Sequence, residues 1–419
     1  MINALTGAPW LSAMARVFDA AQACLYIVGG AVRNPLMGLP LSDIDVCGPM
    51  RPEEVRAMCE GTPVRAVLRA PELGTVELHI TDENGLDQMA EYTCFRQDIY
   101  TSGHRPDRVV FTTDIAADAL RRDFSVNALY QRVHDGYLEP VIDPTGGLAH
   151  LKQGVLHTVT EDPDLVLRND GLRILRAIRF MAELDLLPTP ALAQSLRRYA
   201  RMALEIAPER LREELQKIIM ADMRYPMLKR RFPATLNALE CIRRLGLWDA
   251  LFGFAYDREA AEALQLFSVP DPAARMALLM HKTENAAQLM RDMRFSSAVA
   301  QRTQRCVSAM QRMKDAPLTE LVSLGMDALH AALFALRALG DEPGARAAEA
   351  TLKKLDGKPL SLKELAVTGS DLKPLLMQQH RPLHEMGRTL NALWLAVLED
   401  RVPNQRNALL RCAANELMK

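Results

Sequence analysis

The hydrophobic pattern of the chain changes at about residue 160, and this change limits the possible folds more than any single motif. Before it, short apolar runs alternate with short helical patterns, so we expect strands at 25–28, 43–47, 75–80 and 89–95 and helices at 8–23, 31–37 and 52–59. After it, strand signals almost vanish and helical periodicity continues, interrupted by prolines. The pattern therefore predicts an α+β fold, in which a small mixed β-sheet domain is followed by all-helical units.

The bulk composition excludes several classes of protein. A net charge of −1 excludes a polycation that binds nucleic acid through bulk charge, but it is compatible with a local basic surface. The seven cysteines are scattered without a Cys-x-x-Cys pair, which indicates reduced structural thiols rather than a zinc site or a disulfide framework. No apolar run approaches membrane-spanning length, and no secretory signal is evident. We expect a cytoplasmic protein of about two to four domains that makes no contact with a membrane.

The first chemical motif joins a glycine pair to two carboxylates. Gly29 and Gly30 follow an apolar run and precede a predicted helix, so the backbone and Arg33 would face a phosphate there. Asp43 and Asp45 come next, and residues i and i+2 of a strand point to the same side, which predicts a Mg²⁺ site. A plain turn at the glycines and a solvated strand edge at the carboxylates are the alternatives. The order of the parts favours chemistry on a nucleoside triphosphate.

A second cluster places two arginines, a carboxylate and an amide close together in residues 121–128. Arg122 supplies a cation of the kind that a triphosphate needs, and Asp123 with Asn127 supplies hydrogen-bonding groups suited to a ribose. The alternative is a helix N-terminus, with Asp123 as its cap and the arginines on a solvated surface.

A third cluster places arginines at every third residue of a predicted helix. Asp170, Arg173, Arg176 and Arg179 are expected to form a polar line, and the opposing apolar stripe comprises Leu172, Leu175, Ile178 and Phe180. A solvated helix would normally mix lysine and glutamate into its polar face. Three arginines behind one aspartate instead indicate planar, bidentate recognition.

Asp170 and Arg173 offer a physical basis for choosing a base. Cytosine and adenine both present an exocyclic amino donor beside a ring-nitrogen acceptor, so Asp170 would accept from the amino group while Arg173 donates to the ring. Guanine and uracil present the opposite order and would leave buried partners unpaired, at a cost of about 1–3 kcal/mol per group. Such a pair would admit CTP and ATP and reject GTP and UTP.

Together these motifs closely resemble the class II tRNA nucleotidyltransferases (the CCA-adding enzymes) and their bacterial poly(A) polymerase relatives. The matching segments are Gly29-Gly30-x-Val32-Arg33, Asp43-x-Asp45, Arg121-Arg122-Asp123-Phe124-x-x-Asn127-Ala128, Asp143-Pro144-x-Gly146-Gly147, Asp170-x-x-Arg173, Arg176-Ala177-x-Arg179-Phe180, Pro208-Glu209-Arg210-Leu211-x-x-Glu214-Leu215 and Glu364-Leu365-Ala366-Val367-x-Gly369-x-Asp371-Leu372. The resemblance spans nearly the whole chain, and the order of the motifs makes it specific.

The resemblance implies an enzyme that adds CCA to the 3′ end of tRNA from CTP and ATP and releases pyrophosphate. It implies a nucleotidyltransferase head (1–150), a nucleotide-recognition neck (151–220), a body (221–330) and a tRNA-binding tail (331–419). By family analogy the metal ligands and third carboxylate are Asp43, Asp45 and Glu91. The residues that would contact the nucleotide are Gly30, Arg33, Arg122, Asp123, Asn127, Asp170, Arg173, Arg176 and Arg179.

The chain departs from the family pattern in three places. Asn34 stands where the glycine motif usually continues with aspartate, and Asn169 replaces an acidic residue before the Asp170 template. Between the first two motifs Arg96 and Tyr100 are in place, but His104 precedes Arg105 where a second arginine is usual. Because that stretch is associated with the switch to the final A, addition of CC alone stays an alternative.

The RNA partner would be the acceptor arm and 3′ end of tRNA, lying along basic clusters of the helical part. Those clusters are Arg197/Arg198/Arg201, Lys229/Arg230/Arg231, Arg302/Arg305 and Lys353/Lys354, each of which is also compatible with a solvated helix face. A poly(A) polymerase, a CC-adding or an A-adding enzyme shares the head motifs and stays open. A non-catalytic RNA-binding homologue is the alternative from another class. The sequence leaves the oligomeric state open.

Overall fold

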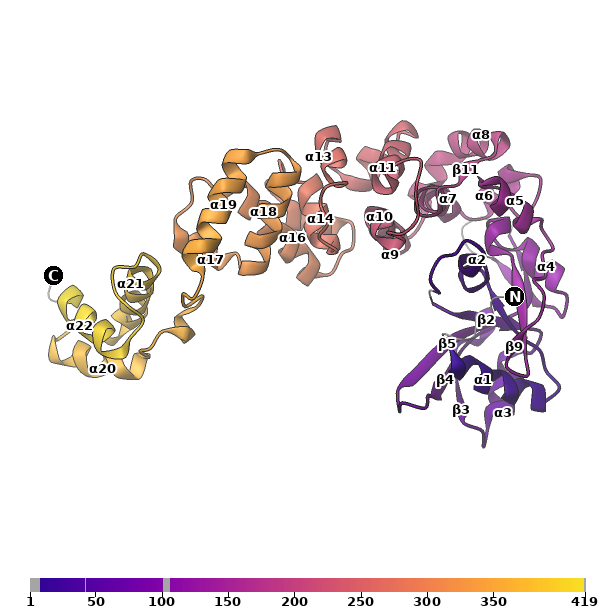
Figure 1. The fold of residues 1–419 in the computed structure, drawn as a ribbon, viewed down its shortest axis with the longest axis horizontal. Coiled ribbons are helices and arrows are strands. Elements are labelled where there is room, and N and C mark those ends of the chain that lie inside the picture. Colours follow the sequence, from indigo (N-terminus) through magenta and orange to yellow (C-terminus); the bar gives the residue numbers. More distant parts are fainter. Residues whose placement is uncertain (1–7, 42, 101–105, 418–419) are drawn as a thin grey trace. The chain divides into compact units, whose positions relative to one another are not determined.

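The computed structural model describes residues 8–41, 43–100 and 106–417. By their internal contacts these residues form two compact units, Met1–Tyr256 and Asp257–Lys419 (Figure 1). The first unit contains all the strands of the described chain, and the second is helical. The predicted α+β class is therefore confirmed. The finer division into head, neck, body and tail stays a prediction.

A seven-stranded mixed sheet forms the centre of the first unit, with the strand order β3-β4-β5-β2-β1-β8-β9. Its strands are β1 (Leu25–Val28), β2 (Asp45–Gly48), β3 (Val64–Ala70), β4 (Thr75–Thr81), β5 (Asp87–Cys94), β8 (Tyr130–His134) and β9 (Tyr137–Leu138). Strands β2 and β5 pair in parallel, and the other neighbouring pairs are antiparallel. Two small ribbons accompany the sheet: β6 (Arg96–Ile99) with β7 (Arg108–Phe111), and β10 (Val155–Leu156) with β11 (Leu187–Pro188).

The helices of the first unit follow the alternation that the sequence predicts, and after about residue 160 only the two-residue strand β11 interrupts them among the described residues. They are α1 (Pro9–Ala20), α2 (Gly30–Leu36), α3 (Pro52–Cys59), α4 (Ile115–Leu120), α5 (Gly147–Gln153), α6 (Pro163–Asn169), α7 (Leu172–Leu184), α8 (Pro190–Tyr199), α9 (Pro208–Ile219), α10 (Ala221–Arg224), α11 (Ala234–Arg244) and α12 (Trp248–Phe252). The expected strand at 25–28 and helix at 52–59 are confirmed with the same bounds. The expected strand at 43–47 begins instead at Asp45, which leaves Asp43 in the loop before it.

The two faces of the sheet are covered differently. Helices α1 and α3 lie against one face (Figure 1). There Leu11, Phe18 and Val55 pack against strand residues such as Leu25 and Leu78. The opposite face is covered over β1, β2 and β8 by side chains from α4 and α6 and by Ala128, which follows the 3₁₀ turn Ser125–Asn127. On that face of β4 and β5 the side chains are solvent-accessible and, apart from Met89, polar. The boundary between the covered and the open half falls at β2.

Helix α7 is buried nearly all the way round, which differs from the amphipathic helix that the sequence predicts. It packs against α9, α10 and α11 as well as the loop after α8, and of its residues only Arg176 keeps substantial exposure. The expected polar line of arginines is therefore inside the protein. The reason is that carboxylates from other elements, which the local pattern does not contain, neutralise the guanidinium groups there.

The second unit consists of helices that pack on their neighbours in sequence. They are α13 (Arg258–Ala263), α14 (Pro272–Leu279), α15 (Ala286–Asp292), α16 (Ser297–Arg312), α17 (Leu318–Ser323), α18 (Met326–Ala338), α19 (Glu342–Leu355), α20 (Gly369–Gln378), α21 (Met386–Leu398) and α22 (Arg406–Leu417). Helices α14, α16, α18 and α19 contact one another, and α20, α21 and α22 enclose a separate apolar cluster. None of the helices in the described part of the chain has both the length and the apolar character of a membrane span.

Candidate active site

Two carboxylates lie side by side at the boundary between the covered and open halves of the sheet. Asp45 is the first residue of β2 and is in register with Glu91 of the parallel strand β5, so both side chains leave the same face. Water reaches Asp45, yet surrounding protein atoms desolvate much of its carboxyl group. This desolvation and the charge of Glu91 raise the pKa of Asp45 to about 6. Arg122 and Arg176 offset this charge only in part, so a bound cation would relieve the pair further.

Asp43 does not share a strand with Asp45, which corrects the geometry expected from their spacing. It sits at a bend before β2, and its side chain is 97% exposed. Its carboxylate oxygen lies 3.9 Å from the Arg224 guanidinium at the end of α10. The electrostatic influence of Asp43 reaches Asp45, so the three carboxylates share one neighbourhood.

The donor chemistry of this neighbourhood fits a hard divalent cation. Asp43, Asp45 and Glu91 offer carboxylate oxygens, the ligands that Mg²⁺ prefers. Burial raises the pKa of Asp45 most, and the neighbouring carboxylates Glu91 and Asp43 raise it further, as expected where carboxylates lie close together. As the side chains lie, no three His, Cys, Asp or Glu groups in the described ranges already converge as a metal cluster. Asp43 and Asp45 therefore remain predicted ligands.

The glycine motif forms a tight entry to helix α2. Gly29 adopts a φ of +65° at the helix N-cap, a conformation that suits glycine, and Gly30 begins the helix. Arg33, which is only 4% exposed, donates from Nη2 to the Asn34 side chain over 2.8 Å and from Nη1 to Asn127. Burial lowers the pKa of Arg33. In this arrangement Arg33 links the glycine motif to the Asn127 motif.

Arg122 is anchored by a carboxylate that the sequence interpretation did not single out. Asp118 of α4 is fully buried and accepts from Arg122 Nη2 over 3.0 Å, from Arg121 Nε over 2.7 Å and from the Tyr130 hydroxyl over 2.8 Å. Burial alone would raise the pKa of Asp118, but Arg122 and Arg121 outweigh it and hold the pKa below its ordinary value. The spacing Asp118-x-x-Arg121-Arg122 on a helix end is the signal that could have revealed it.

Asp123 joins the second motif to helix α7. Its carboxylate accepts from Arg176 Nε over 2.6 Å and from the backbone of Phe124 over 2.8 Å, and Asn127 lies within 3.4 Å. Burial would raise the pKa of Asp123, but Arg176 and Arg173 outweigh it and hold the pKa at about 2. The helix-cap alternative is wrong, because Asp123 bonds to the next residue in a turn and begins no α-helix.

The Asp-Pro-x-Gly-Gly segment supports this motif from outside. A Cβ atom on Gly147 would lie 2.2 Å from the Ser125 carbonyl oxygen, so only glycine fits there. The Asp143 carboxylate accepts from the backbone N–H groups of Gly147 and Leu148 over 2.7 and 2.9 Å. The segment therefore holds the start of α5 directly against the 3₁₀ turn that carries Asn127.

Asp170 and Arg173 are both engaged in protein contacts. Asp170 precedes α7 and accepts from Arg210 Nη2 of α9 over 2.7 Å. Arg173 donates to the backbone carbonyl oxygens of Val166 over 3.1 Å and Arg121 over 2.6 Å. These bonds use two of the five N–H groups of the guanidinium, so the remaining groups can still meet a ligand.

Three guanidinium groups surround one aromatic ring in the interior. The Phe180 ring centroid lies 4.2 Å from Arg179, 5.3 Å from Arg176 and 5.5 Å from Arg33. Arg179 donates to Glu214 over 2.6 Å and to Glu183 over 2.8 Å. The two carboxylates offset the positive charge of Arg179, and the Phe180 ring provides a favourable surface for the three guanidinium groups.

The two carboxylates that pair with Arg179 of α7 were not among the predicted site residues. Glu183 lies one turn after Arg179 on the same helix, a spacing that a search for i, i+4 ion pairs would find. Glu214 comes from α9 and is 3% exposed, and burial would raise its pKa, but Arg179 and Arg176 outweigh this and lower it. Only the Pro208-to-Leu215 resemblance pointed to Glu214.

The stretch between the first two motifs is described in part. Arg96 pairs with Asp98 over 2.9 Å at the start of β6, and burial raises the pKa of the Tyr100 hydroxyl, with Arg173 and Asp170 among its charged neighbours. His104 and Arg105 lie outside the described residues. The prediction that this stretch affects addition of the final A stays untested.

Comparison with known proteins places this site in a family. Residues 25–157 match the model described as poly A polymerase head domain, and residues 273–413 match the one described as putative tRNA nucleotidyltransferase domain 2. The CCA-adding enzyme of Lactiplantibacillus plantarum is 30% identical over 411 residues, covering 94% of this chain and 92% of that protein. The CCA-adding enzyme of Limosilactobacillus fermentum is 28% identical, covering 94% and 93%.

A solved structure supports the same fold. The crystal structure of Bacillus stearothermophilus CCA-adding enzyme in complex with CTP matches with a TM-score of 0.78 at 23% identity, covering 99% of this chain and 98% of that one. The match over residues 25–157 defines the chain as a nucleotidyltransferase with a poly(A) polymerase-type head. Within that class it belongs to the class II CCA-adding enzyme family, whose members generally use a divalent metal ion.

Proposed function

We propose that the protein adds CCA to the 3′ end of tRNA, taking CTP and ATP and releasing pyrophosphate. The observation that carries the proposal is the position of Arg176. It bonds to Asp123 over 2.6 Å, it lies on the same helix as Arg173, and its charge reaches Asp45. One residue thus connects the base-reading helix, the ribose motif and the catalytic carboxylates. The full-length CCA-adding relatives support the same function.

The catalytic half of the site consists of Asp43, Asp45 and Glu91, which would hold Mg²⁺. The chemistry that Mg²⁺ supplies when bound is a lower pKa of the RNA 3′-hydroxyl and neutralisation of the departing pyrophosphate. Arg122 and Arg176 place fixed positive charge beside Asp45, where the triphosphate would lie. Gly30 leaves the entry to α2 free of side-chain atoms for a close approach of phosphate.

The selective half of the site consists of Asp170 and Arg173 with the ribose-binding groups Asp123 and Asn127. Asp170 would accept from the amino group of C or A while Arg173 donates to the ring nitrogen. Arg210 and the two backbone carbonyls already orient these side chains. Arg33 and Arg179 support the site from its interior, because their guanidinium groups donate to protein acceptors.

The RNA would be held by exposed basic residues of the helical part. Several candidate side chains already pair with carboxylates, namely Arg198 with Asp164, Arg231 with Asp185, and Arg302 with Asp271 and Asp327. We assign the phosphates to the other exposed members of these clusters, Arg197, Arg201, Lys229, Lys353 and Lys354. This assignment keeps the predicted division into head, neck, body and tail (1–150, 151–220, 221–330 and 331–419). Binding that hardly weakens as salt rises would contradict it.

The test supplies three tRNAs, ending at the discriminator base, in C or in CC, with CTP, ATP or both. Extension of the first by three nucleotides, with both substrates present, is the expected result. Arrest after two nucleotides would select a CC-adding enzyme, and a long A tail would select a poly(A) polymerase. No extension of a tRNA that binds would select the non-catalytic homologue.

A further inference from the structure

Asn34 stands where the resemblance predicts aspartate, and its amide is used in a way that a carboxylate could not reproduce. It is fully buried, and its Nδ2 donates to the Pro40 carbonyl over 3.1 Å and to the Tyr225 hydroxyl over 3.0 Å. A carboxylate donates no hydrogen bond, so it would leave Pro40 facing an acceptor. The asparagine therefore matches its surroundings in this chain.

Asn34 holds the loop that leads to Asp43. Its backbone carbonyl accepts from the N–H groups of Met37 over 3.0 Å and Leu39 over 2.8 Å, and its side chain fixes Pro40 just beyond. Main chain and side chain of one residue thus hold residues 37–40, the part of the loop that directly follows α2.

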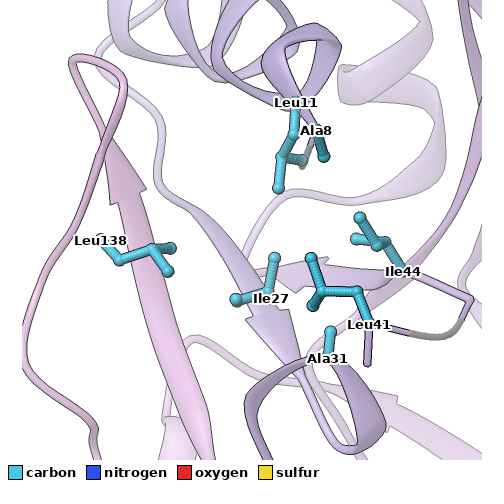
Figure 2. Close-up of a pocket in the computed structure, with 7 residues that line it drawn as sticks. All are labelled: Ala8, Leu11, Ile27, Ala31, Leu41, Ile44 and Leu138. Atoms are coloured by element: carbon cyan, nitrogen blue, oxygen red, sulfur yellow. The ribbon is translucent and has the colours of Figure 1, made fainter. Parts of the chain in front are cut away.

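Leu41 and Ile44, the apolar residues on either side of the segment that contains Asp43, are held by apolar contacts. Leu41 and Ile44 line a small apolar cavity together with Ile27 and Ala31, and Figure 2 shows their side chains beside those of Ala8, Leu11 and Leu138. These contacts hold the loop against β1 and α2. They do not hold the Asp43 carboxylate itself, which is exposed.

Two consecutive residues at the end of α10 contact both ends of this loop. Tyr225, 3% exposed, meets Asn34 at the start, and Arg224 lies 3.9 Å from Asp43 at the finish. Because Asp43 precedes β2, no strand pairing fixes it, and the loop must place it.

We propose that Asn34 and Tyr225 form a clasp that positions Asp43 for metal binding beside Asp45. Both are positioning residues, since they act on Asp43 through the loop. The proposal rests on the proposed function in taking Asp43 and Asp45 as metal ligands. It adds that Tyr225, which lies outside the motifs that carry the family resemblance, helps to set the affinity of the site.

The test is a titration of the purified full-length protein with Mn²⁺, following free Mn²⁺ by electron paramagnetic resonance. The variant Asp45→Asn defines the binding that belongs to this site. Tyr225→Phe should weaken that binding about threefold to tenfold, the range expected for one lost hydrogen bond. The matched control is Tyr256→Phe, which removes a hydroxyl that donates to Glu240 over 2.7 Å in another part of the unit and should leave Mn²⁺ binding unchanged.

A double-variant cycle tests the pairing itself. If Tyr225 acts through Asn34, then Tyr225→Phe should add little to the loss that Asn34→Ala causes alone. In steady state, Tyr225→Phe should raise the Mg²⁺ concentration needed for half-maximal rate while the KM for CTP stays the same. Should Asn34→Ala fail to fold, Tyr225→Phe and its control still decide the matter.

Unaltered Mn²⁺ binding in Tyr225→Phe, or an equal loss in Tyr256→Phe, would overturn the clasp. Because the titration needs neither tRNA nor turnover, it stands apart from the proposed function. Wild-type protein that binds Mn²⁺ through Asp45 but extends no tRNA would contradict the function alone.

Discussion

The two halves of the candidate site are built on opposite electrostatic plans. On the sheet, Asp45 and Glu91 lie side by side, and burial together with the charge of Glu91 raises the pKa of Asp45 to about 6, so the charged form of Asp45 is disfavoured. On α7, every buried charge has a partner, and the pKa of Asp123 falls to about 2 beside Arg176. The carboxylates on the sheet need a bound cation to balance their charge, whereas the charged groups of α7 are paired by other groups of the chain.

This difference in charge pairing indicates what each half of the site needs in order to function. A crowded pair of carboxylates costs stability until a cation binds, which makes the site receptive to metal. A network in which Asp123, Arg176, Arg179 and Glu214 are mutually satisfied holds its geometry before the nucleotide arrives. We expect substitutions in the first half to affect catalysis most and substitutions in the second half to affect folding and selectivity.

The largest effect is expected on catalysis from Asp45→Asn. Losing a metal ligand should reduce incorporation of CTP by about 10²–10⁴-fold, since metal stabilisation of the transition state is worth several kcal/mol. Single-turnover extension of a tRNA lacking CCA measures the rate, and a gel shift should show tRNA binding intact. Asp249→Asn on the exposed start of α12 serves as the control. A variant with near-normal rate would refute the assignment of Asp45.

A large effect on folding is expected from Glu214→Gln. The change removes the charge that pairs with Arg179 over 2.6 Å in the interior, and breaking such a buried pair costs about 3 kcal/mol of unfolding free energy. Glu213→Gln, next in sequence but 59% exposed at its side chain, should change stability by less than about 1 kcal/mol. Urea unfolding measures both. Equal losses of stability in the two variants would contradict the claim that the buried ion pairs around α7 hold the second half of the site.

A smaller effect, on choice of nucleotide, is expected from Asp170→Asn. The amide can donate to the carbonyl of uracil, so the preference for CTP over UTP should fall about tenfold, as expected for one unpaired group. The ratio of kcat/KM values for the two nucleotides measures it. Asp185→Asn, which alters another aspartate–arginine pair of the same unit, should leave the ratio unchanged. If the ratio of kcat/KM values is unchanged in Asp170→Asn, then residues other than Asp170 select the base.

The smallest effect concerns the stability of the metal-free protein. Because the pKa of Asp45 is about 6 when folded and near 3.9 when unfolded, the folded state keeps a proton between these values that the unfolded state releases. The unfolding free energy therefore falls as pH rises through this window and then stays level. At pH 7 Asp45→Asn should be more stable than wild type by about 1 kcal/mol, allowing for solvent screening.

That difference should vanish at acid pH and reverse with metal. Below pH 4 both proteins are neutral at this position, so their unfolding free energies should agree. Added Mg²⁺ should stabilise wild type and not Asp45→Asn, and chelation should restore the original order. Chemical unfolding at several pH values, with and without Mg²⁺, measures all three conditions. If the difference in unfolding free energy between the two proteins does not change with pH, then ionisation of Asp45 does not destabilise the folded state.

Local patterns were enough to predict much of the fold. Strand β1 and helix α3 form where the sequence places them, because a short apolar run and a proline-led amphipathic segment are read from neighbouring residues. The bend at Asp43 could not be read in this way, since the start of β2 depends on its pairing with β1 and β5. The neighbour of Asp45 likewise depends on parallel register with β5, which no local pattern contains.

The candidate site shows the same limit. The arginines of α7 were identified from their spacing and were predicted to recognise a nucleotide, but the spacing could not reveal their partner Glu214, which lies on another helix. Asp118 was not predicted as a site residue, although its i, i+4 spacing to Arg122 is present in the sequence. Its role is to anchor a cation, and only the cations of this segment were interpreted as phosphate ligands. The partner of Asn34, Tyr225, is almost two hundred residues away and could be found only in the folded chain.

The burial of α7 on nearly every side has a consequence for how the gene can change. One residue inserted into a helix turns everything beyond it by about 100°. Between Arg173 and Arg176 such an insertion would swing Arg176, Arg179 and Phe180 away from their partners at once while leaving Arg173 in place. Insertions and deletions should therefore survive in the loops around α7 but not within it, so its length is as constrained as its chemistry.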